Sequence, residues 1–535
     1  MIEKLAYLWP EITLFIATCL VMIVGLSPAA NARRLCSWIC GVALLLAAGL
    51  AAYTPANPDA LFPDLIPYFK GLTAVVGLML LLALAGTVDR DLEDLIDRGK
   101  IKFNPLQANR AEFYSFFLFS LTGLMLCATA DDLIWLFLAL ELTSLPTYVM
   151  VVISTRGTRS QEAGVKYFFL GALGAAVFLY GFALIYGAAG STDFNDIRAA
   201  FAQDGLGSIG TAGMLIALLG VSFKIAAVPM HFYTPDVYQG AASPVSAMLA
   251  FVPKAAGFMS IFALCGLVGW GFGEGSDRLP ESVHAMLWVV AALTMTVGNV
   301  LATLQDSVKR MLAYSSIAHS GYMLVGVLAG PGDTIASNGL AAVLFYLLCY
   351  GVMNVGVFAV LASLRNSRGE EPDALDSLRG LVRSHPLHGW AIILCTLSLL
   401  GFPPLLGFLG KVPLFTSGIS AGLLPLVLIL GVNSAIAAFY YLRLVATVYL
   451  EPKDEDAPAI DTQPIVARPI AAAISAGGVI VLLIAVQPLL EAAHESSRYR
   501  PVEAVEAGAP AADDALLQLS EPITSRDARP ASDAG

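Results

Sequence analysis

The chain has 535 residues, of which 57% are hydrophobic and only 13% are charged. Soluble domains carry about a quarter charged residues, so a single water-soluble globule is excluded. The formal net charge of −11 resides mostly in loops and in the segment after residue 491, and nucleic acid is excluded as a partner. Long uncharged runs reach the ~18 to 20 residues that a membrane-spanning helix needs, for example 167–192, 285–305, 334–364, 412–442 and 469–490. These features predict a multi-pass protein embedded in a lipid bilayer.

Apolar stretches broken by charges or by Pro/Gly clusters predict an all-α membrane protein with about fourteen transmembrane helices. In chain order, the spans are expected near 11–26, 36–53, 70–88, 113–130, 132–153, 165–189, 211–231, 243–269, 285–304, 311–330, 338–364, 390–416, 424–449 and 467–489. We expect the first span to be a retained helix, because cleaving it as a signal peptide would leave an odd number of spans.

The distribution of Lys and Arg predicts the orientation. Counting them in and beside alternate loops gives 17 on one side of the membrane and 4 on the other. Because cytoplasmic loops are the positive ones, the loops after odd-numbered spans are expected in the cytoplasm. Both termini are then expected on the outer, periplasmic side.

Four ionisable residues are predicted at membrane depth, namely Glu141, Lys224, Lys254 and Lys411. Each costs on the order of 2.5 to 3.5 kcal/mol to insert, so four together require a function. The alternative is that each lies at a helix end or belongs to a purely structural buried pair. A lysine in a low-dielectric site releases its proton more readily, and a nearby glutamate opposes that release. A Glu–Lys pair of variable separation is therefore a switchable proton acceptor.

Two spans are predicted to be interrupted beside their lysines. Pro229 removes a helix hydrogen bond close to Lys224. The breaking residues around Lys411 are expected to be Pro403, Pro404 and Pro413. Non-helical backbone at membrane depth is tolerated only inside protein or along a watery cavity, and paired interruptions point to a transport site.

The polar positions also predict an internal repeat. The offset from Lys224 to Lys411 is 187, and the pairs Lys254–Arg443 and Glu141–His319 have offsets of 189 and 178. Spans 4–8 and 9–13 therefore form two five-helix copies, which are inverted because five is odd. The expected organisation is a three-helix segment (1–112), the two repeats (113–269 and 285–449), a last transmembrane helix (450–490) and a disordered acidic tail (491–535).

Two histidines and one arginine are further candidates for the proton path. His319 is predicted near the middle of span 10, His231 just beyond the break of span 7, and Arg443 near the end of span 13. Histidine titrates near neutrality and suits a relay. The alternatives are a hydrogen bond within a helix interface for each histidine and an interfacial position for Arg443.

Four segments carry a resemblance to a known family. They are KYFFLGALGAAVFLYGFALIYGAAGS (166–191), KIAAVPMHFYTPDVYQGAASPVSAMLAFVPKAAGF (224–258), VKRMLAYSSIAHSGYML (308–324) and GFPPLLGFLGKVPLF (401–415). At these residues the chain resembles the antiporter-like membrane subunits of respiratory complex I, the proton-translocating NADH-quinone oxidoreductase. The Pro-Asp-Val-Tyr run at 235–238 makes it most similar to the subunit N branch. The resemblance covers about residues 5–490.

The resemblance implies a role for each deep charge. Glu141 and Lys224 are implied to be the acid and base of an input half-channel, Lys254 the connecting lysine and Lys411 the base of the output side. It also implies a bacterial inner membrane and other membrane subunits of complex I as partners.

No cofactor is expected in this chain, because it holds no nucleotide-phosphate loop and no cysteine set for an iron–sulfur cluster. NADH, FMN, iron–sulfur clusters and quinone are expected in partner subunits. Two alternatives stay open at this point: a subunit of a multi-subunit cation/proton antiporter, and a structural membrane scaffold with inert buried charges.

Overall fold

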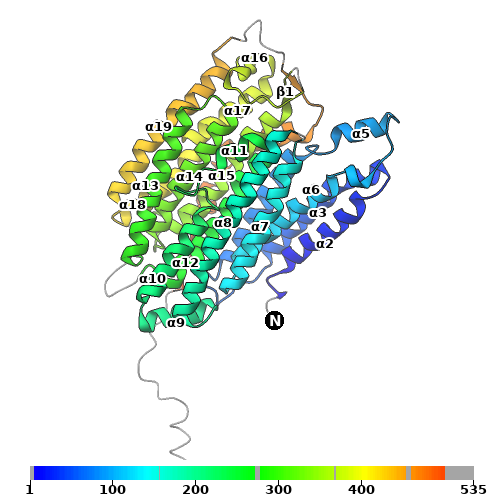
Figure 1. Ribbon diagram of the computed structural model, residues 1–535. Helices are drawn as coiled ribbons and strands as arrows, with labels where there is room; N and C mark the ends of the chain where they lie inside the picture. Colours follow the sequence, from blue (N-terminus) through cyan, green and yellow to red (C-terminus); the bar gives the residue numbers. More distant parts are fainter. Residues whose placement is uncertain (1–4, 156, 272–277, 367–368, 453–459, 501–535) are drawn as a thin grey trace, which may run out of the picture. The chain divides into compact units, whose positions relative to one another are not determined.

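The computed structural model describes residues 5–500 except 156, 272–277, 367–368 and 453–459 (Figure 1). The described residues are helical, with one short two-stranded antiparallel sheet, β1 (Leu364–Arg365) with β2 (Asp461–Thr462). The N-terminal helices are α2 (Trp9–Gly25), α3 (Ala30–Ala52), α4 (Leu65–Leu84), α5 (Arg90–Asp97) and the 3-10 helix η1 (Pro105–Gln107).

The next helices up to residue 268 are α6 (Arg110–Ala128), α7 (Leu133–Ile153), α8 (Thr158–Ala189), α9 (Phe194–Asp204), α10 (Gly207–Ser222), α11 (Thr234–Gly240) and α12 (Ser243–Val268). They are followed by α13 (Glu281–Thr303), α14 (Val308–Ala329), α15 (Gly339–Ser363), η2 (Leu375–Leu378), α16 (Leu381–Ser384), α17 (Pro386–Leu400), α18 (Leu406–Ser420) and α19 (Leu424–Tyr449). The last helices described are α20 (Ala467–Val481) and α21 (Val486–Ser496).

Among the described residues, ten helices are long and apolar enough to cross a membrane, or eleven if the bent pair α20–α21 forms one span. Three shorter apolar helices are α2, α10 and α17. The expectation of an all-helical, multi-pass membrane protein is therefore confirmed.

Burial divides the helices into inner and outer ones. Nearly every residue of α12, α14 and α15 is buried, whereas α3, α8, α13 and α19 are less than half buried. Their uncovered residues are large and apolar, for example Phe169 on α8 and Phe439 on α19. Such surfaces are typical of helices that face lipid.

Small residues let α8 and α10 approach closely. A side chain at Gly181 would come within 2.3 Å of the backbone nitrogen of Ala217, and one at Gly220 within 2.3 Å of that of Phe178. Backbone contact of this kind is the usual packing of helices in membranes, where burial of apolar surface does not drive association.

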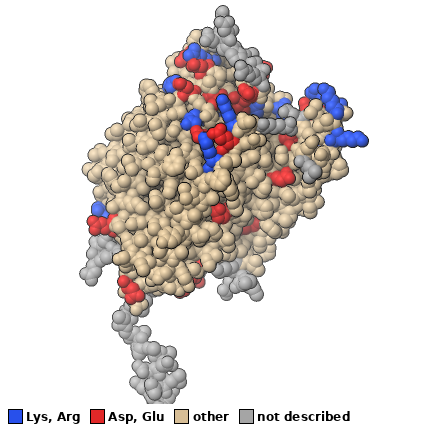
Figure 2. Space-filling model, in the orientation of Figure 1, with Lys and Arg blue, Asp and Glu red and all other residues tan. Residues whose placement is uncertain are grey.

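Charged side chains gather at one end of the molecule. Figure 2 shows most visible Lys, Arg, Asp and Glu residues at the end that carries α5, α16 and β1 in Figure 1, while the flank is largely uncharged. This charged end contains the segments after α4, α15 and α19, which were expected to be cytoplasmic loops.

Three sequence expectations need correction. The span expected at 467–489 is two helices bent by 91°, because Pro488 lacks the N–H for the carbonyl one turn earlier. The expected tail boundary at 491 is too early, since α21 continues to Ser496. Pro413 lies inside α18 and does not interrupt it; transmembrane helices tolerate an interior proline when neighbours satisfy the freed carbonyl. The interruption lies between α17 and α18, at Pro403 and Pro404.

Candidate functional site: a buried row of ionisable side chains

Glu141 and Lys224 form an ion pair between α7 and the break that follows α10. Lys224 Nζ lies 3.1 Å from Glu141 Oε1 and donates a 2.7 Å hydrogen bond to Ser144 Oγ. The Lys224 side chain is 2% exposed and that of Glu141 is 17% exposed. Because an unpaired charge at this depth would be costly, the two charges stabilise each other.

Local sequence explains where these two residues lie. Asp132 caps the N-terminus of α7 by accepting a 2.7 Å hydrogen bond from the Trp135 amide, which sets the start of the helix. The helix α10 ends at Ser222, and the break between α10 and α11 includes Pro229 and the alanine Ala226 at φ +54°. A left-handed alanine is an unfavourable conformation that tertiary packing has to maintain.

Lys254 lies in the middle of α12 and contacts α14. Its Nζ donates to the Ser316 carbonyl oxygen, and the side chain is buried. The same stretch of α14 reaches the break, because Ser320 Oγ donates to the Ile225 carbonyl at 2.7 Å and lies 3.3 Å from the Ser316 carbonyl. Hydrogen-bonded groups of α14 therefore connect the neighbourhood of Lys224 with Lys254.

His319 lies one turn further along α14 and makes two hydrogen bonds to tyrosines. Its Nδ1 is 2.6 Å from Tyr346 Oη and its Nε2 is 2.9 Å from Tyr441 Oη. Both contacts are buried, and in the neutral ring the tautomer decides which tyrosine donates and which accepts.

Lys411 lies in α18 and reaches back across the second break. Its Nζ donates a 2.8 Å hydrogen bond to the carbonyl of Leu400, the last residue of α17. This position favours a cation, because the end of a helix carries partial negative charge. The lysine is buried.

Aromatic rings connect the two lysines to His319. Lys254 Nζ is 5.8 Å from the ring centre of Tyr350, whose ring is 5.1 Å from that of His319. Lys411 Nζ is 5.1 Å from the ring centre of Tyr322, whose ring is 5.4 Å from that of His319. The structure thus brings Lys254, His319 and Lys411 together around one tyrosine cluster.

His231 and Arg443 lie apart from this row. His231 is half-buried next to the exposed Phe232, and its Nδ1 has no hydrogen-bond partner among the described residues. Arg443 is 37% exposed and pairs with Asp306 at 2.6 Å, at the charged end of the molecule. Arg443 therefore lies at a partly exposed position and does not join the buried row.

Sequence reasoning missed other buried ion pairs, and one of them joins Lys70 to Glu11. Lys70 Nζ is 2.7 Å from Glu11 Oε1 and also donates to the Tyr7 carbonyl; both side chains are almost fully buried. Glu141 is therefore not alone as a buried carboxylate. Glu11 and Lys70 lie at the first residues of apolar runs, so they were assigned to helix boundaries. Ser144 was also missed, although it lies three residues after Glu141 and therefore on the same helix face.

Among the described residues, no three His, Cys, Asp or Glu side chains group as a metal site would require. The ionisable row holds one carboxylate, three ammonium groups and one imidazole, which can bind and release protons.

Comparison with known proteins identifies one family and several relatives of this chain. Residues 130–437 match the family described as NADH:quinone oxidoreductase/Mrp antiporter, TM. The chain is 36% identical over 516 residues to NADH-quinone oxidoreductase subunit N of Myxococcus xanthus, which covers 90% of this chain and 95% of the relative. It is 42% identical over 355 residues to the subunit N of Trichlorobacter lovleyi, covering 65% of this chain and 70% of the relative.

Solved structures with the same fold include a chain of respiratory complex I from Thermus thermophilus, with 31% identity, a TM-score of 0.71, and coverage of 90% of this chain and 98% of that one. A chain of the Mrp complex from Dietzia sp. is similar in fold alone, with 19% identity, a TM-score of 0.73, and coverage of 93% and 97%.

Proposed function

The chain belongs to the NADH:quinone oxidoreductase/Mrp antiporter family, in its subunit N branch, and we propose that its buried row of ionisable residues carries protons across the membrane. In this role the chain is a membrane subunit of the proton-translocating NADH-quinone oxidoreductase. Electron transfer from NADH through FMN and iron–sulfur clusters to quinone takes place in partner subunits, and the other membrane subunits are its neighbours.

The observation that carries the proposal is the Glu141–Lys224 pair beside a helix break. Glu141 stabilises the protonated form of Lys224, so a change in their separation changes the tendency of the lysine to release its proton. The break supplies the flexible backbone that such a change needs. A released proton then has acceptors further along the row.

The next acceptors are Lys254, His319 and Lys411. The hydroxyl of Ser320 and the carbonyl of Ser316 extend from the break to Lys254. His319 lies between Lys254 and Lys411, because its ring is next to Tyr350, which faces Lys254, and to Tyr322, which faces Lys411. In this proposal Lys411 releases the proton on the far side of the second break. The row requires groups that gain and lose protons, not fixed charges.

Substitution of Lys411 tests this proposal. Lys411→Ala removes a titratable group, and Lys411→Arg keeps a charge that stays protonated at any working pH, so both should lower proton pumping by roughly tenfold or more. NADH-driven quinone reduction and proton uptake are measured in membranes normalised to assembled complex. Wild-type pumping by the Arg variant would show that Lys411 is a fixed charge and would refute the output step.

The proposal includes fourteen crossings, two inverted repeats and a bacterial inner membrane with both termini periplasmic. The count is reached if α2, α10–α11, α17–α18 and α20–α21 each cross once in addition to the other long helices. Two sets of five crossings follow the N-terminal segment. The first set ends with α12 and the second with α19, and these two helices each have 26 residues. An odd number of crossings reverses the second set.

A cation/proton antiporter subunit has the same fold, but the relatives named subunit N are much more similar in sequence than the Mrp chain. The scaffold alternative predicts that Lys411→Ala leaves pumping unchanged, so the same experiment distinguishes it.

A further inference from the structure

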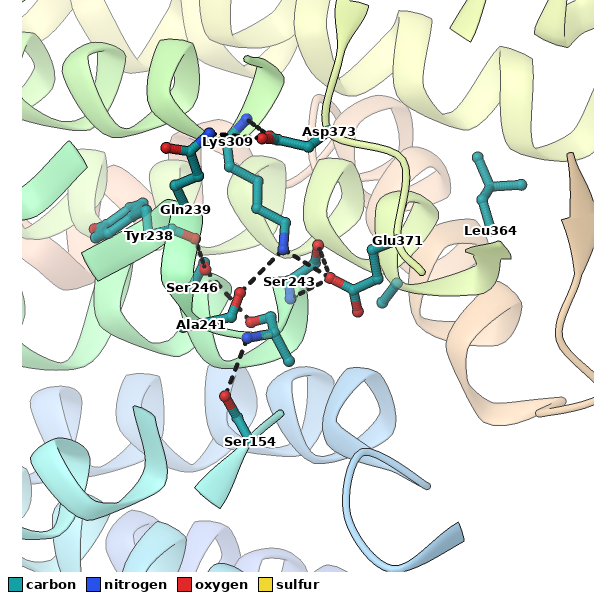
Figure 3. A network of polar contacts seen from close by, with 12 residues as sticks. Ser154, Tyr238, Gln239, Ala241, Ser243, Ser246, Lys309, Leu364, Glu371 and Asp373 are labelled. Atoms are coloured by element: carbon teal, nitrogen blue, oxygen red, sulfur yellow. Dashed lines mark hydrogen bonds and ion pairs between the residues drawn. The ribbon is translucent and has the colours of Figure 1, made fainter. Parts of the chain in front are cut away.

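Three residues, Ala241, Ala242 and Ser243, form the turn between α11 and α12, which we call the elbow. Each makes a polar contact with a different element. Ala241 accepts a 3.0 Å hydrogen bond from Lys309 Nζ of α14, and the Ala242 amide donates a 3.1 Å hydrogen bond to Ser154 Oγ at the end of α7 (Figure 3). The elbow is therefore the point at which the helices that carry Glu141, Lys254 and His319 are held together.

The third contact is made by Glu371, from the connection that follows α15. Its Oε2 accepts hydrogen bonds from the Ser243 amide at 2.8 Å, from Ser243 Oγ at 2.6 Å and from Lys309 Nζ at 2.8 Å (Figure 3). One carboxylate oxygen thus joins the first residue of α12 to the first turn of α14. The Glu371 side chain is 11% exposed, so these bonds are largely shielded from water.

The segment that bears Glu371, residues 369–374, is attached to α14. The Val308 amide donates to the Asp373 carbonyl at 2.7 Å, and Ser307 Oγ donates to Asp373 Oδ1 at 2.6 Å. Ser307 and Ala374 form a β-bridge. Because the segment is bonded to the start of α14, the hydrogen bonds of Glu371 to Ser243 couple the position of the elbow to that of α14.

We infer that Glu371 is a positioning residue for proton transfer: it fixes the depth of α12 relative to α14 and so holds Lys254 against the Ser316 carbonyl. This inference rests on the proposed function. Lys254 lies eleven residues after Ser243, or roughly 16 Å along the helix, and Ser316 lies seven residues after Lys309, or roughly 10 Å. Helices are stiff over such lengths, so the anchor at the charged end sets the contact in the interior.

Charge at Glu371 is needed for this function. Burial by itself raises its pKa, but the charges of Lys309 and Arg365 outweigh burial and hold the pKa at about 2. The ionised carboxylate also faces the N-terminus of α12, where the Ser243 amide and the helix dipole favour a negative charge. An amide oxygen of the same shape can still accept hydrogen bonds, but it carries no charge to balance Lys309 or the dipole.

The test compares Glu371→Gln with Glu371→Asp in the assembled complex, with Glu370→Gln as the matched control. Glu370 is the adjacent, exposed carboxylate. Amide hydrogen exchange of Ser243 and of residues 245–247 should become about tenfold faster in Glu371→Gln, because a charge-assisted anchor is lost. Proton pumping per complex should fall about tenfold, since small misplacements of reacting groups are costly. Glu371→Asp should stay within about twofold of wild type in both measurements, because the charge is kept.

Unchanged exchange or unchanged pumping in Glu371→Gln would overturn the inference, as would a loss of the same size in Glu370→Gln. If Glu371→Gln does not assemble, Ser243→Ala removes one of the three donors and keeps both charges. It should raise exchange in the first turn of α12 about threefold, and no change would overturn the inference. Lys254→Met separates the two proposals, because normal pumping in that variant refutes the proton row and leaves the exchange result for Glu371 intact.

Discussion

At the scale of single residues, the function depends on the contact between Glu141 and Lys224. Glu141→Gln keeps the shape of the side chain but removes the charge that stabilises protonated Lys224. We expect normal assembly and roughly tenfold lower proton pumping, measured as NADH-driven proton uptake in reconstituted vesicles.

The control for this variant is Glu162→Gln. Glu162 pairs with Lys166 at 2.8 Å but is 65% exposed, and exposed pairs contribute little. Normal pumping by Glu141→Gln, or an equal loss in Glu162→Gln, would contradict a switching role for the buried pair.

The depressed pKa of Glu371 gives a second residue-scale prediction. An ordinary glutamate has a pKa of about 4.3, so the folded state favours the ionised form by about 3 kcal/mol at neutral pH. This contribution to the stability of the folded state is fully present above the pKa that Glu371 has in the unfolded chain, and it is lost as the pH falls toward 2. The protection factors of the elbow amides, which are the intrinsic exchange rates divided by the observed rates at the same pH, should therefore be equal at pH 8 and pH 6 and fall only below about pH 4. Weaker protection of the elbow amides at pH 6 than at pH 8 would contradict a pKa of about 2 for Glu371.

The sequence could predict the deep charges but not their partners. Glu141, Lys224, Lys254 and Lys411 are conspicuous because charges are rare in apolar runs. Ser144 and Ser316 are not, because serine is common in transmembrane helices and a backbone carbonyl has no sequence signal. Glu11 and Lys70 begin their apolar runs, and only the ion pair that joins α2 to α4 in the structure shows that they are buried together.

At the scale of helices, glycine determines how closely α8 and α10 pack. In Gly181→Val the new side chain would meet the backbone of Ala217, which cannot move aside as a flexible side chain could. We expect a destabilisation of about 3 kcal/mol or failure to assemble, measured by thermal unfolding and by subunit content of purified complex.

The same substitution at Gly187 is the matched control on the same helix. Among the described residues, no atom other than those of the neighbouring helix backbone lies within 4 Å of a Cβ built at Gly187, so Gly187→Val should assemble like the wild type. Equal behaviour of the two variants would show that α8 and α10 do not pack as described.

The positions of helix breaks could be predicted from proline only in part. Pro229, Pro403 and Pro404 lie in breaks, whereas Pro413 lies in α18 and Pro146 in α7. A proline removes one hydrogen bond wherever it lies, and the surrounding packing decides whether the helix ends. Neighbouring helices are not visible in a local sequence pattern.

At the scale of the whole molecule, the described chain ends in contacts with the N-terminal part. Tyr499 Oη donates to the Gly266 carbonyl at 2.9 Å, and its ring packs against Trp270 and Phe62. The Arg500 amide donates to the Leu61 carbonyl at 3.1 Å. These residues were assigned to the tail, but they close the end of the bundle opposite to the charged loops.

Truncation tests this division of the C-terminus. A chain ending at Arg500 should assemble and pump normally, because the removed residues have a composition too polar to pack. A chain ending at Ser497 loses Arg498, Tyr499 and Arg500 and should melt several degrees lower, since it removes buried aromatic area and the hydrogen bonds that Tyr499 and Arg500 make with Gly266, Leu61, Pro58 and Arg198. Loss of pumping in the first truncation, in fully assembled complex, would refute the expectation that the tail is dispensable.

The burial of α14 has a consequence for biosynthesis. It is the least apolar of the ten long helices, it carries Lys309 and His319, and nearly all of its surface is covered by other helices. A nascent helix of this kind gains little by leaving the insertion machinery for lipid alone, because its polar groups find their partners on other segments of the chain, among them the elbow, the segment that bears Glu371, α12, α15 and α19. We therefore expect α14 to be retained at the translocon until α15 has emerged, so that the chain enters the bilayer in groups of helices rather than one at a time.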